Sequence, residues 1–220
     1  LAIPLFVFAG NLLNETGITT RLMRFASVLA GHLQGGVAQA NVIVATLIGG
    51  ITGSAIADAS LQARVLGPGM TERGYSRGCS AGVIGFSSLI VTMIPPSIGL
   101  ILYGSIGEVS IGRLFAAGIV PGLLMAATLM TAVAIIARTK KYRAEREHAA
   151  SPREVASAFV DCIWAIIFPV LLIIGLRFGL FTPSEAGAFA VVYAILVGVL
   201  AYREFTWRKF LATLEYTVLD

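Results

Sequence analysis

Charged residues are scarce in this chain. They make up 13% of its 220 residues, whereas an average soluble domain carries about 25%. Hydrophobic residues make up 57%, and the mean hydropathy is +0.86. Several apolar runs approach or exceed the roughly 20 residues that a helix needs to cross a bilayer. The composition therefore excludes a water-soluble domain and predicts an all-α, polytopic membrane protein with the lipid bilayer as its solvent.

Cysteine and histidine are also rare. The two cysteines, Cys79 and Cys162, are far apart and form no CxxC motif, so neither a redox centre nor a zinc site is expected. The two histidines, His32 and His148, lie in polar segments without a second ligand at metal-binding spacing. The net charge of +4 comes from basic residues in loops, where they report topology. We therefore expect no cofactor and no nucleic-acid partner.

An initiator methionine and a basic leader are missing as well, because Leu1 opens directly in an apolar run. We expect the sequence to be an internal piece of a longer protein. Residues 1–36 are then a truncated helix followed by an amphipathic connecting helix. In the second helix, apolar residues at helical spacing lie beside Arg21 and Arg24, a pattern typical of a helix at the membrane interface or packed on other helices.

Glycines and polar residues interrupt the apolar run that extends from residue 37 to residue 61. In lipid, backbone groups that leave a helix are tolerated only where they face protein or a water-filled cavity. We therefore predict a re-entrant hairpin over residues 37–63, with one straight spanning helix as the alternative. The same stretch contains Asp58. An ionisable residue inside a membrane segment is costly and indicates a functional site.

A second interruption, Pro95-Pro96-Ser97, lies in the apolar run of residues 79–106. The prolines remove backbone donors and disfavour a continuous helix, so we predict a broken helix with two halves that meet at Ser97. Two interrupted apolar segments close together indicate a transporter binding site. Residues 37–110 are accordingly predicted to form one half of a transport domain.

The remaining sequence predicts further membrane helices on both sides of a basic loop. Residues 111–137 are long enough to span the bilayer. Six basic residues lie in the loop of residues 138–154, which the positive-inside rule places in the cytoplasm. Residues 155–220 are predicted to contain two helices, over 159–176 and 186–202. Thr182 and Glu185, just before the second, are predicted to be a helix cap and first turn and not ligand-binding residues.

The two interruptions offer chemistry for a cation and for an anion. Unwound carbonyls and hydroxyls suit a small hard cation such as sodium, whereas the N-terminus of a half-helix suits a carboxylate. The candidate sodium ligands are Gly50, Thr52, Gly53 and Ser54. The candidate substrate-binding residues are Ser54, Asp58, Pro96 and Ser97. Close packing of small residues and hydroxyls between helices is the alternative explanation of the pattern.

Four motifs resemble, in the same order along the chain, those of a known family. They are residues 3–11, 50–58, 94–97 and 179–186. Together they resemble the large permease subunit of TRAP transporters, the DctM type. The family often has serine in place of Thr52, so this departure keeps the hydroxyl. On this resemblance, residues 50–58 are the first hairpin turn, and the proline interruption belongs to the broken helix that faces it.

The resemblance implies sodium-driven import of organic acids, such as C4-dicarboxylates or sugar acids, across the bacterial inner membrane. It implies a small DctQ-type membrane subunit and a periplasmic DctP-type substrate-binding protein as partners, and Na⁺ as the coupling ion. It also implies an elevator-type transporter with an inverted-repeat fold. Family members are much longer, so residues 155–220 would only begin the second repeat, and half of the binding site would lie outside this chain.

Other functions remain as alternatives. A stand-alone sodium-coupled elevator carrier for dicarboxylates agrees with the interrupted helices but less well with the four motifs. An intramembrane serine protease with Ser54 as nucleophile would need a general base, and neither histidine lies in a membrane segment. A structural or assembly membrane protein would leave Asp58 and the paired interruptions unexplained.

Overall fold

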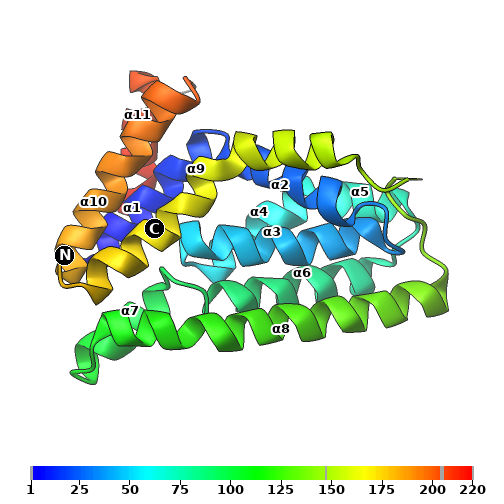
Figure 1. Cartoon of the computed structure of the whole chain (residues 1–220), viewed down its shortest axis with the longest axis horizontal. Helices are drawn as coiled ribbons and strands as arrows, with labels where there is room; N and C mark the ends of the chain where they lie inside the picture. Colours follow the sequence, from blue (N-terminus) through cyan, green and yellow to red (C-terminus); the bar gives the residue numbers. More distant parts are fainter. Residues whose placement is uncertain (1, 147, 204–205, 220) are drawn as a thin grey trace.

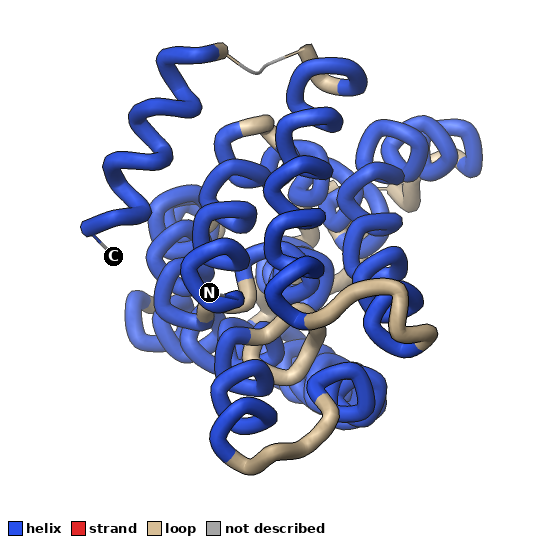
Figure 2. The backbone as a smooth tube through the Cα atoms, turned by 90° about the vertical axis from the view of Figure 1, so that its left-hand side faces the viewer, coloured by secondary structure: helices blue, strands red, loops and turns tan. Residues whose placement is uncertain are grey.

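The computed structural model describes residues 2–146, 148–203 and 206–219, and all regular structure in these residues is helical (Figure 2). It consists of eleven α-helices and one π-helical turn. In chain order they are α1 (Ala2–Glu15), α2 (Ile18–Ala30), α3 (Gly36–Thr52), α4 (Ala55–Val65), α5 (Gly67–Glu72), α6 (Arg77–Val91), α7 (Ile98–Ile106), α8 (Ile111–Lys140), α9 (Pro152–Arg177), α10 (Pro183–Leu196), η1 (Val197–Ala201) and α11 (Trp207–Leu219).

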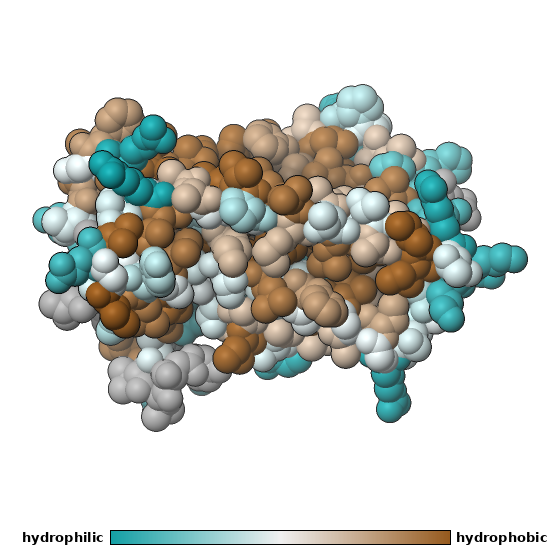
Figure 3. Space-filling model, turned by 90° about the horizontal axis from the view of Figure 1, so that it is seen from below, coloured by the Kyte–Doolittle hydropathy of each residue, from teal (hydrophilic) through white to brown (hydrophobic). Residues whose placement is uncertain are grey.

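Three of the described helical segments are long and apolar enough to cross a membrane, namely Ile111–Lys140, Pro152–Arg177 and Ser184–Ala201. The 30 residues of α8 extend about 45 Å, which exceeds the roughly 30 Å of a bilayer's hydrocarbon core. On the face seen from below Figure 1, hydrophobic residues occupy the middle of the long axis, and hydrophilic residues gather toward its two ends (Figure 3). The prediction of an all-α, polytopic membrane protein is confirmed.

Many of the helices run along the long axis, so that loops collect at its two ends (Figure 1). The connection from α8 to α9 lies at the same end as α5. The turns that join α7 to α8 and α9 to α10 lie at the opposite end. The first end carries the basic segment that the positive-inside rule assigns to the cytoplasm, and α3 also begins there.

The glycine-rich interruption separates two helices that run in opposite directions. α3 ends at Thr52, Gly53 takes a left-handed conformation with φ of 61°, and Ser54 caps the start of α4. α4 returns toward the end at which α3 began, and Val37 of α3 packs in one apolar cluster with Met70, which follows α4. The segment is therefore a hairpin and not one straight helix.

The structure shortens the basic loop predicted over residues 138–154. α8 extends to Lys140, and α9 begins at Pro152, well before residue 159, where the apolar run predicted its start. The physical reason is a capping box. The Glu154 N–H donates to the Ser151 hydroxyl at 3.2 Å, and the Ser151 N–H donates to the Glu154 carboxylate at 3.0 Å. These two bonds satisfy orphan donors and start the helix within the polar segment.

A second capping box begins α10. The Glu185 N–H donates to the Thr182 hydroxyl at 3.3 Å, and the Thr182 N–H donates to the Glu185 carboxylate at 2.7 Å. This arrangement confirms that these two residues form a helix start, as their spacing predicts. α10 thus begins slightly before the helix predicted over 186–202, and η1 continues it to Ala201.

Two apolar clusters of buried residues hold the helices together. The first includes Leu13 of α1, Leu22 of α2 and Phe168 of α9. The second includes Ile90 of α6 and Val133 of α8. α3 contributes residues to both clusters, so the hairpin lies between the two parts of the core and is packed on both sides.

We predict that Gly118→Ala destabilises the protein. A Cβ at Gly118 of α8 would lie 2.3 Å from the Met93 carbonyl oxygen, between α6 and α7. Overpacking of this kind costs about 1–3 kcal/mol, so the melting temperature of the purified protein in detergent should fall. Gly85→Ala is the matched control, because nothing lies within 4 Å of its Cβ position. An equal fall in both variants would contradict the prediction.

Candidate functional site

The hairpin turn, Gly53 and Ser54, lies directly against the proline break, residues 92–97 between α6 and α7. The Ile98 N–H donates to the Gly53 carbonyl oxygen at 3.3 Å. A Cβ on Gly53 would lie 2.8 Å from the Pro96 carbonyl oxygen. Glycine fits here both for its left-handed backbone and for this close approach. The structure therefore brings the two sequence interruptions into contact.

Two helices begin at this contact, and a serine caps each of them. The Ser54 hydroxyl accepts the Ala57 N–H of α4 at 3.4 Å, and the Ser97 hydroxyl accepts the Leu100 N–H of α7 at 3.4 Å. Ser97 is fully buried and also donates to the Thr92 carbonyl at 2.7 Å. The N-terminus of a helix offers free N–H groups and the positive end of its dipole. The contact can therefore accommodate an anion such as a carboxylate.

Carbonyl groups from the same two interruptions gather beside these N-termini. The carboxyl end of α3 points into the turn, and its Gly50 is buried. A Cβ on Gly50 would lie 3.2 Å from the Pro95 carbonyl oxygen and 2.9 Å from the ring of Pro169 in α9. Within the described residues, no group of three His, Cys, Asp or Glu side chains gathers to hold a metal ion. The carbonyls and the Ser54 hydroxyl at the turn are oxygen ligands of the kind that a small hard cation prefers.

The structure shows the positions of three of the four predicted sodium ligands. Gly50, Gly53 and Ser54 lie at the contact, whereas the side chain of Thr52 lies outside the described part of the structure. Among the predicted substrate-binding residues, Pro96 and Ser97 are buried in the break that faces the turn. Their roles in binding stay predictions.

Asp58 is fully buried in the first turn of α4, against α6 and one helical turn from the hairpin turn. Its carboxylate accepts a hydrogen bond from the Gln62 amide, and the Ser88 hydroxyl of α6 also faces it. Its Oδ1 atom is buried and has no hydrogen-bond partner in the described part of the protein. Because a buried carboxylate oxygen without a donor is costly, this atom marks a place where a cation or a water molecule would be stabilised.

Three further polar residues, which the sequence did not single out, extend from Asp58 into the protein. Gln62 of α4, Ser87 of α6 and Asn41 of α3 are fully buried. The Asn41 amide donates to the Ser87 hydroxyl at 2.7 Å, and that hydroxyl lies 3.2 Å from the Gln62 carbonyl oxygen. We call Asn41, Ser87, Gln62 and Asp58 the polar chain. Asn41 and Gln62 could have been suspected because each is an amide within or beside an apolar run.

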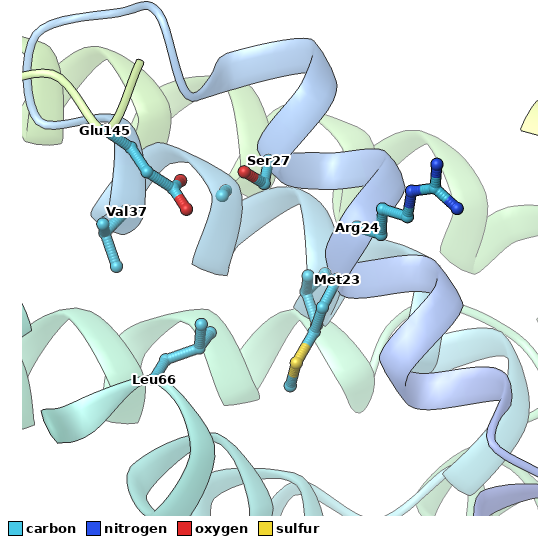
Figure 4. A pocket seen from close by; sticks show the side chains of 8 residues that line it. Met23, Arg24, Ser27, Val37, Leu66 and Glu145 are labelled. Carbon is cyan, nitrogen blue, oxygen red and sulfur yellow. The ribbon is translucent and has the colours of Figure 1, made fainter. Parts of the chain in front are cut away.

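A cavity of about 280 Å³ lies beside α2 and apart from the hairpin turn. Met23 and Ser27 of α2 line it together with Val37 at the start of α3, Leu66 after α4 and Glu145 of the α8–α9 connection (Figure 4). Its lining is mostly apolar and includes none of the residues predicted to bind substrate or sodium. The cavity belongs to the junction between the amphipathic helix and the hairpin.

Curated relatives of the chain include several transporter subunits. It is 40% identical over 207 residues to the 2,3-diketo-L-gulonate TRAP transporter large permease of Escherichia coli, covering 94% of this chain and 48% of the relative. It is 37% identical over 208 residues to the sialic acid TRAP transporter permease of Haemophilus influenzae, covering 94% and 33%. It is 36% identical over 204 residues to the C4-dicarboxylate TRAP transporter large permease of Pseudomonas aeruginosa, covering 93% and 47%.

The chain thus spans about half or less of the length of these relatives. A family model described as the DctM component of tripartite ATP-independent periplasmic transporters matches residues 1–219, which is nearly the whole sequence. The chain therefore belongs to the DctM family of TRAP transporter large permeases.

Proposed function

We propose that this chain forms part of the large membrane permease of a tripartite, sodium-coupled importer of organic acids in the bacterial inner membrane. The observation that carries the proposal is the contact between the hairpin turn and the proline break. It places two helix N-termini and the carboxyl end of a third helix at one buried point, between the two ends of the long axis (Figure 1). Such discontinuous helices are the usual binding elements of secondary transporters.

Sodium coupling is supported by the chemistry of the carbonyl groups at the contact. A small hard cation prefers oxygen ligands, and unwound backbone in transporters supplies them. Gly50 and Gly53 allow the carbonyls of Pro95 and Pro96 to approach the hairpin closely. The buried carboxylate of Asp58 lies one helical turn away and supplies negative charge that favours a cation nearby.

An organic acid as substrate is supported by the two capped N-termini and by the relatives. The N-termini of α4 and α7 favour negative charge. The three relatives are named for 2,3-diketo-L-gulonate, sialic acid and C4-dicarboxylates, all of which carry a carboxylate. We propose a substrate of this chemical class for the chain.

The partners and the motion follow from membership in a tripartite family. We propose a small DctQ-type membrane subunit and a periplasmic DctP-type binding protein, which would deliver the substrate. In an elevator motion, α3 to α7 would move as one unit, because the hairpin and the broken helix are joined through Gly53 and Ile98. α1, α9 and α10 would form the scaffold, and α2 would connect the two.

Protease activity is the less favoured alternative. The Ser54 hydroxyl accepts a backbone N–H as a helix cap, and both histidines, His32 and His148, are exposed in loops. A serine nucleophile needs a base within hydrogen-bond reach. The placement of Ser54 therefore favours a role in helix capping and binding over nucleophilic attack.

We predict that uptake requires both a binding protein and sodium. The full-length permease and its small membrane partner would be reconstituted in proteoliposomes and tested with 2,3-diketo-L-gulonate, sialic acid and a C4-dicarboxylate. Uptake of one of these acids should need the cognate binding protein and an inward sodium gradient. Uptake that persists without the binding protein would indicate a stand-alone carrier. Uptake that is equal in potassium would overturn sodium coupling.

We also predict that Gly53→Ala lowers this uptake at least tenfold. Alanine at a φ of 61° is strained by about 1–3 kcal/mol, and its Cβ would meet the Pro96 carbonyl. The hairpin turn would therefore separate from the break. Gly74→Ala is the matched control, since its φ is 84° but nothing lies within 4 Å of its Cβ position. Similar losses in both variants would show that backbone strain alone explains the effect.

A further inference from the structure

The polar chain crosses the interior formed by the hairpin helices α3 and α4 together with α6, which we call the hairpin unit, and it ends at Asp58. Its four side chains come from α3, α4 and α6, and each has an exposed fraction of 0%. Membrane helices can pack through apolar contacts alone, and buried polar groups are stabilised only when they find partners. A chain of four fully buried polar residues therefore calls for an explanation beyond packing.

The hydrogen bonds of the chain have a direction. The Asn41 Nδ2 donates to Ser87 Oγ at 2.7 Å. The Ser87 hydroxyl has two acceptors in reach, the Ile84 carbonyl oxygen at 2.9 Å and Gln62 Oε1 at 3.2 Å. Gln62 Nε2 in turn donates to Asp58 Oδ2. Both amides, Asn41 and Gln62, thus donate in the direction of the carboxylate, and donors directed at a carboxylate stabilise its negative charge.

Gln62 is the residue that fixes this arrangement. Its amide presents Nε2 to Asp58 because an ionised carboxylate can only accept hydrogen bonds, and its Oε1 then faces the Ser87 hydroxyl. Gln62 and Asp58 are four residues apart on α4, so they lie on the same helix face. The carboxylate is held with Oδ2 bound to Gln62 and with Oδ1 buried and unpartnered within the described residues. The Ser88 hydroxyl faces the carboxylate but donates to the Ile84 carbonyl at 2.9 Å.

We propose that Gln62, oriented by Ser87 and Asn41, is a positioning residue for sodium coupling, because it holds Asp58 so that its free Oδ1 faces the coupling cation. This inference rests on the proposed sodium-coupled function and extends it from the hairpin turn into the α3–α4–α6 interior. Removal of the Gln62 amide should leave Asp58 free to rotate and should weaken the response to sodium without removing the hairpin.

The test measures sodium affinity on the purified full-length permease in detergent. Sodium chloride is titrated against potassium chloride at constant ionic strength, and the sodium concentration that gives half of the rise in melting temperature is determined. Gln62→Leu keeps the side-chain volume but removes the amide. We expect its half-saturating sodium concentration to rise at least fivefold.

Gln39→Leu is the matched control. Gln39 is also a buried amide, with an exposed fraction of 2%, but it donates to the Met130 carbonyl of α8 at 2.9 Å and takes no part in the polar chain. This variant should lower the melting temperature through the same loss of a buried hydrogen bond. Its half-saturating sodium concentration should stay within twofold of the parent protein.

If Gln62→Leu does not fold, a second pair of variants tests the proposal in the same titration. Ser87→Ala removes the hydroxyl that links Asn41 to Gln62 Oε1, whereas Ser80→Ala removes a buried hydroxyl on the same helix that has no partner in the described residues. We expect a two- to threefold rise in half-saturating sodium concentration for Ser87→Ala and no change for Ser80→Ala.

The outcomes separate this inference from the proposed function. Suppose that the parent protein responds to sodium, but the half-saturating sodium concentration shifts equally in the polar-chain variants and in their controls. This result would overturn the role of Gln62 and leave sodium coupling in place. A parent protein with the same response to sodium and potassium would overturn the coupling itself, and the inference with it.

Discussion

The rest of this structure depends on how four helix ends satisfy their backbone groups at one buried point. α3 and the first half of the broken helix end there, while α4 and α7 begin there. Free N–H and carbonyl groups inside a membrane protein need partners. Ser54 and Ser97 satisfy the starts of two helices, and the hydrogen bond from Ile98 to Gly53 joins the two interruptions. The long helices are fitted around this point, since Gly118 of α8 approaches Met93 and Pro169 of α9 approaches Gly50.

The apolar clusters and the buried polar residues have different roles in the molecule. The two apolar clusters surround the hairpin and hold its helices in register. Inside this frame, the polar chain connects the three helices of the hairpin unit and directs its donors to one carboxylate. A core that was selected for stability alone would replace these residues with apolar ones. Their presence, one helical turn from the contact of the interruptions, is consistent with a site that must bind and release a charged species.

Much of the fold could be predicted from the sequence because, in a bilayer, backbone polar groups must find partners within the protein. The glycine cluster inside an apolar run predicted a hairpin, and the Thr182–Glu185 spacing predicted a helix start. The start of α9 was missed because hydropathy was given more weight than the capping pattern of Ser151 and Glu154. The link from Asn41 through Ser87 to Gln62 could not be predicted, because it depends on which faces of three helices meet. For the same reason, the sequence could not show that Asp58 lies against α6.

Hydrogen–deuterium exchange of the full-length permease in sodium and in potassium tests the central claim most directly. The peptides that cover residues 49–58 and 92–100 contain the two sides of the contact, including the Ile98 amide that donates to Gly53. If the contact is the coupling site, both peptides exchange more slowly in sodium, and they do so at the same sodium concentration. Unchanged exchange in both peptides, or a change in only one of them, would contradict the account.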